Sequence, residues 1–205
     1  MSGFITYFPK EQVKALEKAG DKGPISVIFG SIHTKMPSIK SVKVGDIIYP
    51  ITLTDGTINV LARLPVEEIE VAYDYCVREL GNSFGSLTPE GKDWHDFYDT
   101  PPFPHKKHQE PFNCCSQLAA TSQNGSTIKL RPMKKELMPV LRFGRKGKEI
   151  PLRFDKNGGV AIVSVSSVVR RMSEETQKIF EEVFQSKPTE NDMYKISETK
   201  NHYLM

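Results

Sequence analysis

Hydrophobic positions at the start of the chain follow the spacing first of a strand, then of a helix, then of a second strand. Phe4–Phe8 has the composition of a short strand. Val13 and Leu16 then place one apolar stripe on a helix that begins after Pro9. Ile25–Phe29 is rich in β-branched residues, which is typical of a buried strand. This part of the chain therefore predicts the order strand, helix, strand.

A β-hairpin is predicted in the following segment. Asp55-Gly56 is a strong signal for a tight turn, and it follows a hydrophobic strand that includes Ile47–Tyr49. Beyond the turn, hydrophobic and polar residues alternate over Ile58–Ala62, as they do in a strand with one buried face. Val66–Leu80 is then predicted as a short strand and a helix.

A similar pattern returns 102 residues later. Two glycine turns and an alternating segment recur in the same order, and a helix is predicted over Ser173–Phe184 with Ser173 as its cap. The matched pairs are Pro37 and Pro139, Gly45 and Gly147, Ile48 and Ile150, Gly56 and Gly158, Ile58 and Val160, Val60 and Ile162, and Val66 and Val168. The repeat indicates either an internal duplication or consecutive hairpins of one mixed barrel.

These elements predict an α+β fold, either a β-barrel or two β-hairpin-plus-helix units packed together. The expected organisation has four parts. They are a first hairpin–helix unit at 1–82, a connecting loop at 83–112, a second hairpin–helix unit at 113–185 and a polar tail at 186–205. The connecting loop is rich in proline and in aromatic residues, which favours an ordered, packed segment over a disordered linker.

Composition places the chain among ordinary globular proteins. Of its 205 residues, 38% are hydrophobic and 26% are charged. No apolar run approaches the roughly 18 residues of a membrane span, and the N-terminus lacks the pattern of a secretion signal. Three cysteines, two of them adjacent, do not form a disulfide framework. We therefore expect a cytoplasmic protein without a membrane partner.

Positive charge is concentrated in the second half of the chain. Between Lys129 and Lys156 there are ten Lys or Arg residues and three acidic ones, whereas the overall net charge is only +3. Clustered Lys and Arg supply most of the affinity of proteins for phosphate backbones. The segment is thus either a solvated face with ordinary charge scatter or a surface that meets nucleic acid.

The pattern VKVGDIIYPI…DG…VLARLPVEEIE, together with the stretch FGSIHTKMPSIKSV before it, resembles the PUA-like superfamily, in particular its EVE and ASCH branches. The resemblance covers about 45 residues of the first half and has a fainter echo in the second. Its matching residues are Lys43, Gly45, Asp46, Ile47, Ile48, Ala62 and Val66. Gly30 and Lys35 fill part of the Gly-x-Lys-x-x-x-x-Arg pattern of ASCH domains, but the spacing differs and the arginine is missing.

This resemblance implies a small β-barrel that holds RNA or a modified nucleotide in a cleft beside the sheet. Cations flanking the hairpins can contact phosphate, and an aromatic side chain of the connecting loop can stack on a base. The candidate ligand-binding residues are His33, Lys35, Lys40, Trp94, His105, Arg142, Arg145 and Lys146. For each cation the alternative is an ordinary surface charge, and for Trp94 it is an anchor over the core.

The stretch HKKHQEPFNCCSQ, residues 105–117, gathers histidine and cysteine. As a zinc site it has the wrong spacing, since structural sites favour two to four residues between cysteines, so no metal is expected. As a nucleophile, Cys114 or Cys115 would lie on the first turn of a helix over CCSQLAAT, where the helix dipole favours a thiolate. His108 or His105 would be the base, and Gln109 or Asn113 an oxyanion donor. The plainer alternative is that these small residues pack under the loop.

The leading hypothesis is a non-enzymatic module that binds RNA, DNA or a nucleotide-derived ligand, without a cofactor, in RNA handling or in conflict between phage and host. The alternative is a cysteine-dependent enzyme that uses Cys114 or Cys115 with His108. A protein-interaction domain is the third. Common signatures of nucleotide enzymes and hydrolases, such as Walker A or Gly-x-Ser-x-Gly, do not occur in the chain.

Overall fold

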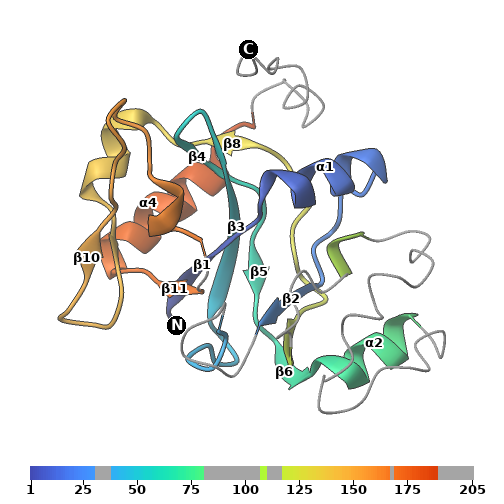
Figure 1. Ribbon diagram of the computed structural model, residues 1–205. Helices are drawn as coiled ribbons and strands as arrows, with labels where there is room; N and C mark the ends of the chain where they lie inside the picture. Colours follow the sequence, from blue (N-terminus) through green and yellow to red (C-terminus); the bar gives the residue numbers. More distant parts are fainter. Residues whose placement is uncertain (31–37, 81–106, 110–116, 167–168, 189–205) are drawn as a thin grey trace.

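The structure is a computed structural model that describes residues 1–30, 38–80, 107–109, 117–166 and 169–188. Helices and strands are mixed along the chain, so the fold is of the α+β kind that the sequence predicts (Figure 1). The α-helices are α1 (Lys10–Lys18), α2 (Ala72–Leu80) and α4 (Glu174–Gln185). The 3-10 turns are η2 (Lys107–Gln109), η3 (Lys135–Val140) and η4 (Ile162–Ser164).

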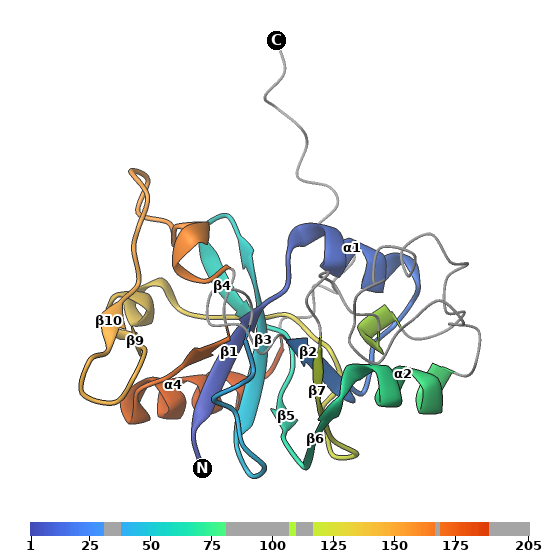
Figure 2. The same cartoon turned by 60° about the horizontal axis from the view of Figure 1, so that its bottom comes forward.

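The main sheet has the strand order β11-β1-β3-β4-β8, and β5 pairs with β3 off this path. Its strands are β1 (Gly3–Tyr7), β3 (Ile47–Thr54), β4 (Thr57–Val60), β5 (Leu64–Pro65), β8 (Arg131–Pro132) and β11 (Arg170–Arg171). β1 and β3 run parallel, and the other neighbours are antiparallel. Figure 2 shows the main strands in the centre, with α4 on one side and α1 and α2 on the other.

The main sheet is buried on both faces, which explains why β3 reads as a nearly continuous hydrophobic run. Ile48 and Phe4 contribute to one core, which α1 covers through Leu16. Tyr49 and Ile5 point the other way, because neighbouring strand residues alternate between faces, and they pack in a second core. α4 closes this second core with Phe180, whose ring meets that of Tyr49 edge to face.

A second sheet lies beside the first and has the antiparallel order β2-β7-β6. Its strands are β2 (Val27–Gly30), β6 (Glu68–Val71) and β7 (Leu118–Thr121). α2 covers one face, where Phe29 and Tyr75 pack edge to face. Ile28 and Ala120 face the opposite way and join the core under α1. The remaining strand pair is a hairpin of β9 (Arg142–Phe143) and β10 (Ile150–Pro151).

Several predicted elements are confirmed. The helix after Pro9 is α1, with Val13 and Leu16 on its buried side. Asp55-Gly56 is the turn between β3 and β4. The predicted cap of the last helix is also present, because the Ser173 hydroxyl accepts a hydrogen bond from the backbone N–H of Thr176 at 3.2 Å.

Other expectations were wrong. Leu118–Thr121 was predicted to be part of a helix with Cys114 and Cys115, but it is strand β7. It lies between β2 and β6 and pairs with both, and this tertiary pairing overrides the low strand propensity of its alanines. The alternating segment of the second repeat is not a strand: Val160 forms one isolated bridge to Phe154, and η4 follows. No sheet in the described residues closes into a barrel.

Within the described ranges, no helix combines the length and the apolar character needed to cross a lipid bilayer.

Candidate active site

The strongest polar cluster in the described part of the chain is built on a buried histidine. His108 lies in η2, between α1 and α2, and its side chain is 1% exposed (Figure 1). Its ring nitrogen Nδ1 lies 2.7 Å from Oδ2 and 2.9 Å from Oδ1 of Asp21, whose side chain is 3% exposed. The backbone N–H of His108 donates to the same carboxylate at 2.8 Å. Asp21 therefore fixes both the backbone and the ring of His108.

The carboxylate of Asp21 is held in its charged form. Burial raises the pKa of Asp21, but hydrogen bonds from His108 and from the backbone N–H of Gly23 outweigh burial, so its pKa lies below the ordinary value. A carboxylate only accepts hydrogen bonds, so the proton between the two residues belongs to Nδ1 of His108. In the neutral ring this leaves Nε2 as an acceptor.

Ser26 is the partner of that second nitrogen. Its hydroxyl oxygen lies 3.2 Å from Nε2 of His108, which gives the chain of contacts Asp21, His108, Ser26. A carboxylate that orients a histidine, and a histidine that accepts from a hydroxyl, is the arrangement that activates a serine as a nucleophile. Ser26 is only half-buried, whereas His108 and Asp21 are fully buried.

Two further donors converge on the same hydroxyl. Tyr75 Oη lies 3.2 Å and Gln109 Nε2 lies 3.3 Å from Ser26 Oγ, and these two groups are 3.0 Å from each other. Burial raises the pKa of Tyr75, so its hydroxyl stays protonated at neutral pH and can donate. Ser26, Tyr75 and Gln109 all line a cavity of about 150 Å³, which extends between α2 and the second sheet.

Local backbone contacts place Ser26 at the start of β2. The carbonyl of Ser26 accepts from the N–H of Ser122 at 3.0 Å, and the N–H of Ile25 donates to the carbonyl of Ser126 at 2.9 Å. Gly125 lets these two segments approach, since a Cβ on this residue would lie 1.7 Å from the carbonyl oxygen of Ile25. The position of the serine is thus set by backbone pairing and by one close glycine contact.

The rim of the cavity is acidic. Glu67, Glu68 and Glu79 line it, and all three are exposed. Hydrogen bonds from the Asn124 side chain and the Gln123 backbone lower the pKa of Glu67.

Arg78 is the one cation among the residues that line this cavity in the described structure. Its guanidinium makes a two-pronged contact with Glu70 at 2.7 and 2.8 Å and reaches Glu79 at 3.1 Å. Its charge is therefore matched by two carboxylates, of which that of Glu79 also lines the cavity.

Of the predicted nucleophiles and bases, the structure describes His108, whose partners are Asp21 and Ser26. Cys114 and Cys115, its predicted nucleophiles, lie outside the described residues. Asp21, Ser26 and Tyr75 were missed, because they are 87, 82 and 33 positions away from His108 and no local motif links them. Gln109, predicted as an oxyanion donor, does point at the Ser26 hydroxyl.

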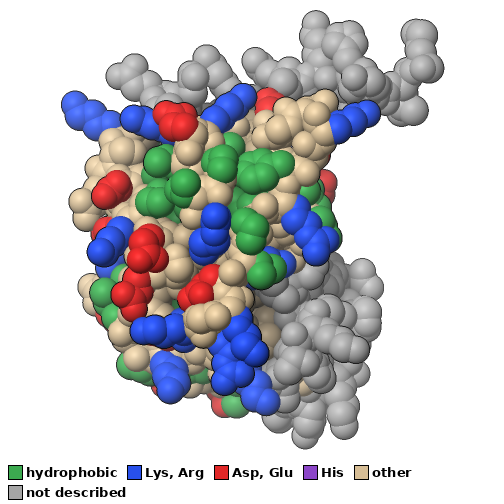
Figure 3. All heavy atoms as spheres, turned by 90° about the vertical axis from the view of Figure 1, so that its left-hand side faces the viewer, with side chains coloured by type: hydrophobic (Ala, Val, Ile, Leu, Met, Phe, Trp, Pro, Cys, Tyr) green, Lys and Arg blue, Asp and Glu red, His purple; other side chains and the backbone are tan. Residues whose placement is uncertain are grey.

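Of the candidate ligand-binding residues, His33, Lys35, Trp94 and His105 lie outside the described residues. Lys40 is exposed in the turn before β3. The other candidates, Arg142, Arg145 and Lys146, are exposed at β9 and in the turn that follows it. On the face that Figure 3 shows, Lys and Arg alternate with Asp and Glu around a group of hydrophobic side chains.

Two of these cations have partners close by in the chain's own structure. The guanidinium of Arg142 donates to the carbonyls of Pro139 and Leu141 at 2.7 and 2.9 Å, and Lys146 lies 3.3 Å from a carboxylate oxygen of Glu174.

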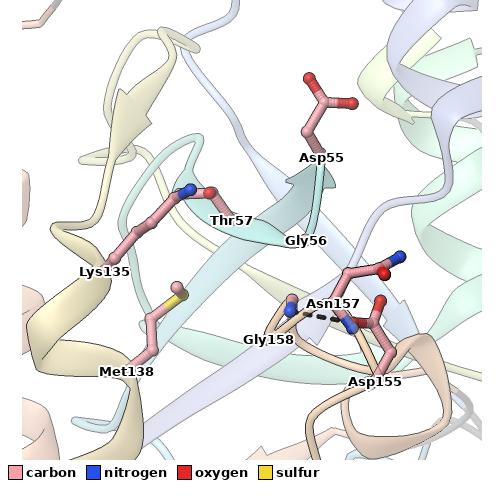
Figure 4. Close-up of a pocket in the computed structure, with 9 residues that line it drawn as sticks. Asp55, Gly56, Thr57, Lys135, Met138, Asp155, Asn157 and Gly158 are labelled. Atoms are coloured by element: carbon pink, nitrogen blue, oxygen red, sulfur yellow. Dashed lines mark hydrogen bonds between the residues drawn. The ribbon is translucent and has the colours of Figure 1, made fainter.

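A larger hollow of about 330 Å³ separates η3 from two glycine turns. Figure 4 shows Lys135 and Met138 on one side and the turn with Asp155 and Asn157 on the other. The carboxylate of Asp155 accepts from the backbone N–H groups of Asn157 and Gly159 at 2.8 and 3.0 Å, so it already stabilises its own turn. No serine, cysteine or histidine lines this hollow in the described structure.

In the described ranges, no group of three or more histidine, cysteine or acidic side chains is placed to hold a metal ion. No family model, no curated protein and no solved structure matched the chain.

Proposed function

We propose that the chain is a hydrolase of esters or amides that uses Ser26 as its nucleophile. The observation that carries this proposal is the continuous set of contacts from Asp21 through His108 to Ser26, with only the serine opening on a cavity. Asp21 and His108 are both buried and the half-buried Ser26 is the outermost of the three, which leaves the reacting atom open to a substrate.

The reaction follows from the donors and acceptors. Ser26 Oγ attacks the carbonyl carbon of the substrate while its proton passes to Nε2 of His108. Asp21 keeps its negative charge and stabilises the imidazolium through Nδ1. The carbonyl oxygen becomes an oxyanion, for which Tyr75 Oη and Gln109 Nε2 are the nearest donors to the nucleophile. Collapse of the intermediate expels the leaving group, which takes the proton from His108 and leaves Ser26 acylated.

The second half of the reaction reverses the first. Water attacks the acyl carbon and gives a proton to Nε2 of His108, and the acid is released as that proton returns to Ser26 Oγ. The cavity beside Ser26 has the volume of about five water molecules, which admits a small acyl or leaving group together with the attacking water.

The test is covalent labelling with a fluorophosphonate, which phosphonylates an activated serine with loss of fluoride. We expect mass spectrometry to find the label on Ser26 in the folded chain. Ser26→Ala removes the site, and His108→Gln removes the base while circular dichroism reports whether the variant is folded. Ser41→Ala, which changes an exposed serine that does not line the cavity, is the control and keeps the labelling. A folded wild-type chain that stays unlabelled at Ser26 contradicts the proposal.

Binding of RNA, DNA or a nucleotide is the second proposed function, and the PUA-like resemblance remains part of it. It is supported by the exposure of Lys40, Arg145 and Lys146. Binding that weakens steeply as salt rises, and that is reduced by Arg145→Glu with Lys146→Glu, is the expected result. Absence of RNA binding at low salt removes this proposal and leaves the hydrolase proposal untouched.

A further inference from the structure

The acidic rim indicates the charge of the substrate. We propose, building on the hydrolase function of Ser26, that the site takes small esters or amides that carry a positive charge close to the reacting carbonyl. Glu67, Glu68 and Glu79 line the same cavity as Ser26.

Of these, Glu68 is held in place through its backbone. Its backbone belongs to β6 and pairs with Thr121 of β7, while its side chain is exposed at the cavity. Glu67 is fixed more firmly, since Gln123 and Asn124 both donate to its carboxylate. These hydrogen bonds lower the pKa of Glu67, so it keeps its negative charge under mildly acidic conditions.

The positive charge of Arg78 does not cancel the negative charge of the rim. Its charge lies in a network with Glu70 and Glu79, and its guanidinium stacks over the ring of Tyr75 at 5.5 Å. Paired in this way, it neutralises one of its two partners and leaves the wall around Ser26 with an excess of carboxylates. An anionic ligand such as a phosphate therefore meets repulsion at this cavity, and a cation meets attraction.

The size of the cavity sets a second limit. At about 150 Å³ it holds a short acyl group, so a long chain must project past the glutamates into solvent. The expected substrate class is consequently an ester or amide with a short acyl group and an ammonium group, on either side of the scissile bond. The preference rests on exposed charges, each worth a factor of a few at most, so three together give roughly a tenfold preference.

A matched series of acetate esters tests this inference. Acetylcholine carries a cation, 3,3-dimethylbutyl acetate is its uncharged isostere, and 3-acetoxypropanoate is anionic. Acid release is followed at constant pH, and we expect kcat/KM to fall in that order, by about tenfold between the first two. The preference should shrink in high salt, because salt screens exposed charges.

The variant that isolates the rim is Glu67→Gln with Glu68→Gln. It should remove most of the preference for the cation, and circular dichroism reports whether the variant is folded. Glu136→Gln, an exposed glutamate on η3, is the matched control and should leave the preference intact.

The outcomes separate the two proposals. Labelling of Ser26 with equal or inverted ester preference overturns the charge inference and leaves the hydrolase proposal in place. Failure to label Ser26 together with no hydrolysis of any ester overturns both. A preference for the cation that survives in the double glutamine variant shows that the rim does not select the substrate, and it overturns the inference as well.

Discussion

Asp21→Asn is the substitution that tests the site most directly. The carboxylate accepts two hydrogen bonds from His108 and one from the backbone of Gly23, with its side chain almost fully buried. Asparagine keeps one oxygen, which we expect to accept from His108. Its amide group then faces the backbone N–H of Gly23, and because both groups are donors, no hydrogen bond forms there.

The magnitude follows from these three bonds. Each bond from His108 changes from charge-assisted to neutral, at about 1 kcal/mol apiece, and the bond from Gly23 is lost for about 1 kcal/mol more. Asp21→Asn should therefore lower the free energy of unfolding by about 3 kcal/mol at pH 7. Urea denaturation followed by circular dichroism measures it. Asp74→Asn, at an exposed aspartate on α2, is the control and should change stability by less than about 0.5 kcal/mol.

The pH dependence has a definite sign. The pKa of Asp21 is lower in the folded chain than its ordinary value of 3.8. The stabilisation from Asp21 is thus fully present above pH 3.8, and it is lost as pH falls from there through the lower folded pKa. In that window the wild-type chain should lose its advantage over Asp21→Asn. An advantage that stays constant down to pH 2 would show that the carboxylate is not the source.

The same variant separates a structural from a chemical role. In a site that only fixes η2, Asp21→Asn lowers stability and nothing else. If His108 activates Ser26, the variant also loses the anion that stabilises the imidazolium, and labelling of Ser26 by fluorophosphonate should slow by up to about 10⁴-fold. Equal labelling rates in folded wild type and folded Asp21→Asn refute the reasoning.

Three further substitutions or reactions test other parts of the structure. Tyr49→Phe removes the hydroxyl that donates to Glu181 and should lower the free energy of unfolding, measured in urea, by about 1 kcal/mol. An unchanged free energy of unfolding would contradict this hydrogen bond. Burial, with the charge of Glu70 as a smaller cause, raises the pKa of Cys76 to about 12, so peptide mapping should find its thiol unalkylated by iodoacetamide at pH 8 until the chain is unfolded. Gly125→Ala should destabilise the fold by about 1–3 kcal/mol and slow Ser26 labelling, because its Cβ displaces Ile25; unchanged values for both would contradict the close contact.

Elements with local signals were predictable from the sequence. α1 is predicted by Pro9 and by two apolar residues three positions apart, Val13 and Leu16, and α4 is predicted by its capping serine. The β3–β4 hairpin follows from one Asp-Gly pair. Leu118–Thr121 has no such signal, because its strand conformation depends on distant partners: Thr121 pairs with Val27, 94 residues earlier, and Leu118 pairs with Val71, 47 residues earlier.

In the candidate site, too, one residue has a local sequence signal and the others depend on distant partners. His108 stands out in the sequence, and its sequence neighbourhood points to the cysteines that follow. Its partners in the structure are Asp21, at the end of α1, and Ser26, at the start of β2, which no spacing rule connects with residue 108. An aspartate before a Gly-Pro turn has an ordinary local explanation, so its role becomes visible only when η2 is placed against it.

The convergence on Ser26 is what favours chemistry over a purely structural role. To hold η2 in place, the pair of Asp21 and His108 is sufficient, since it already joins backbone and ring to one carboxylate. A hydroxyl at Nε2, with Tyr75 and Gln109 both directed at that hydroxyl, adds polar groups that a structural contact does not need. Burying such groups is unfavourable unless each is paired. Their meeting at the hydroxyl of the half-buried Ser26, which lines a cavity, is the arrangement expected of a nucleophile and its donors.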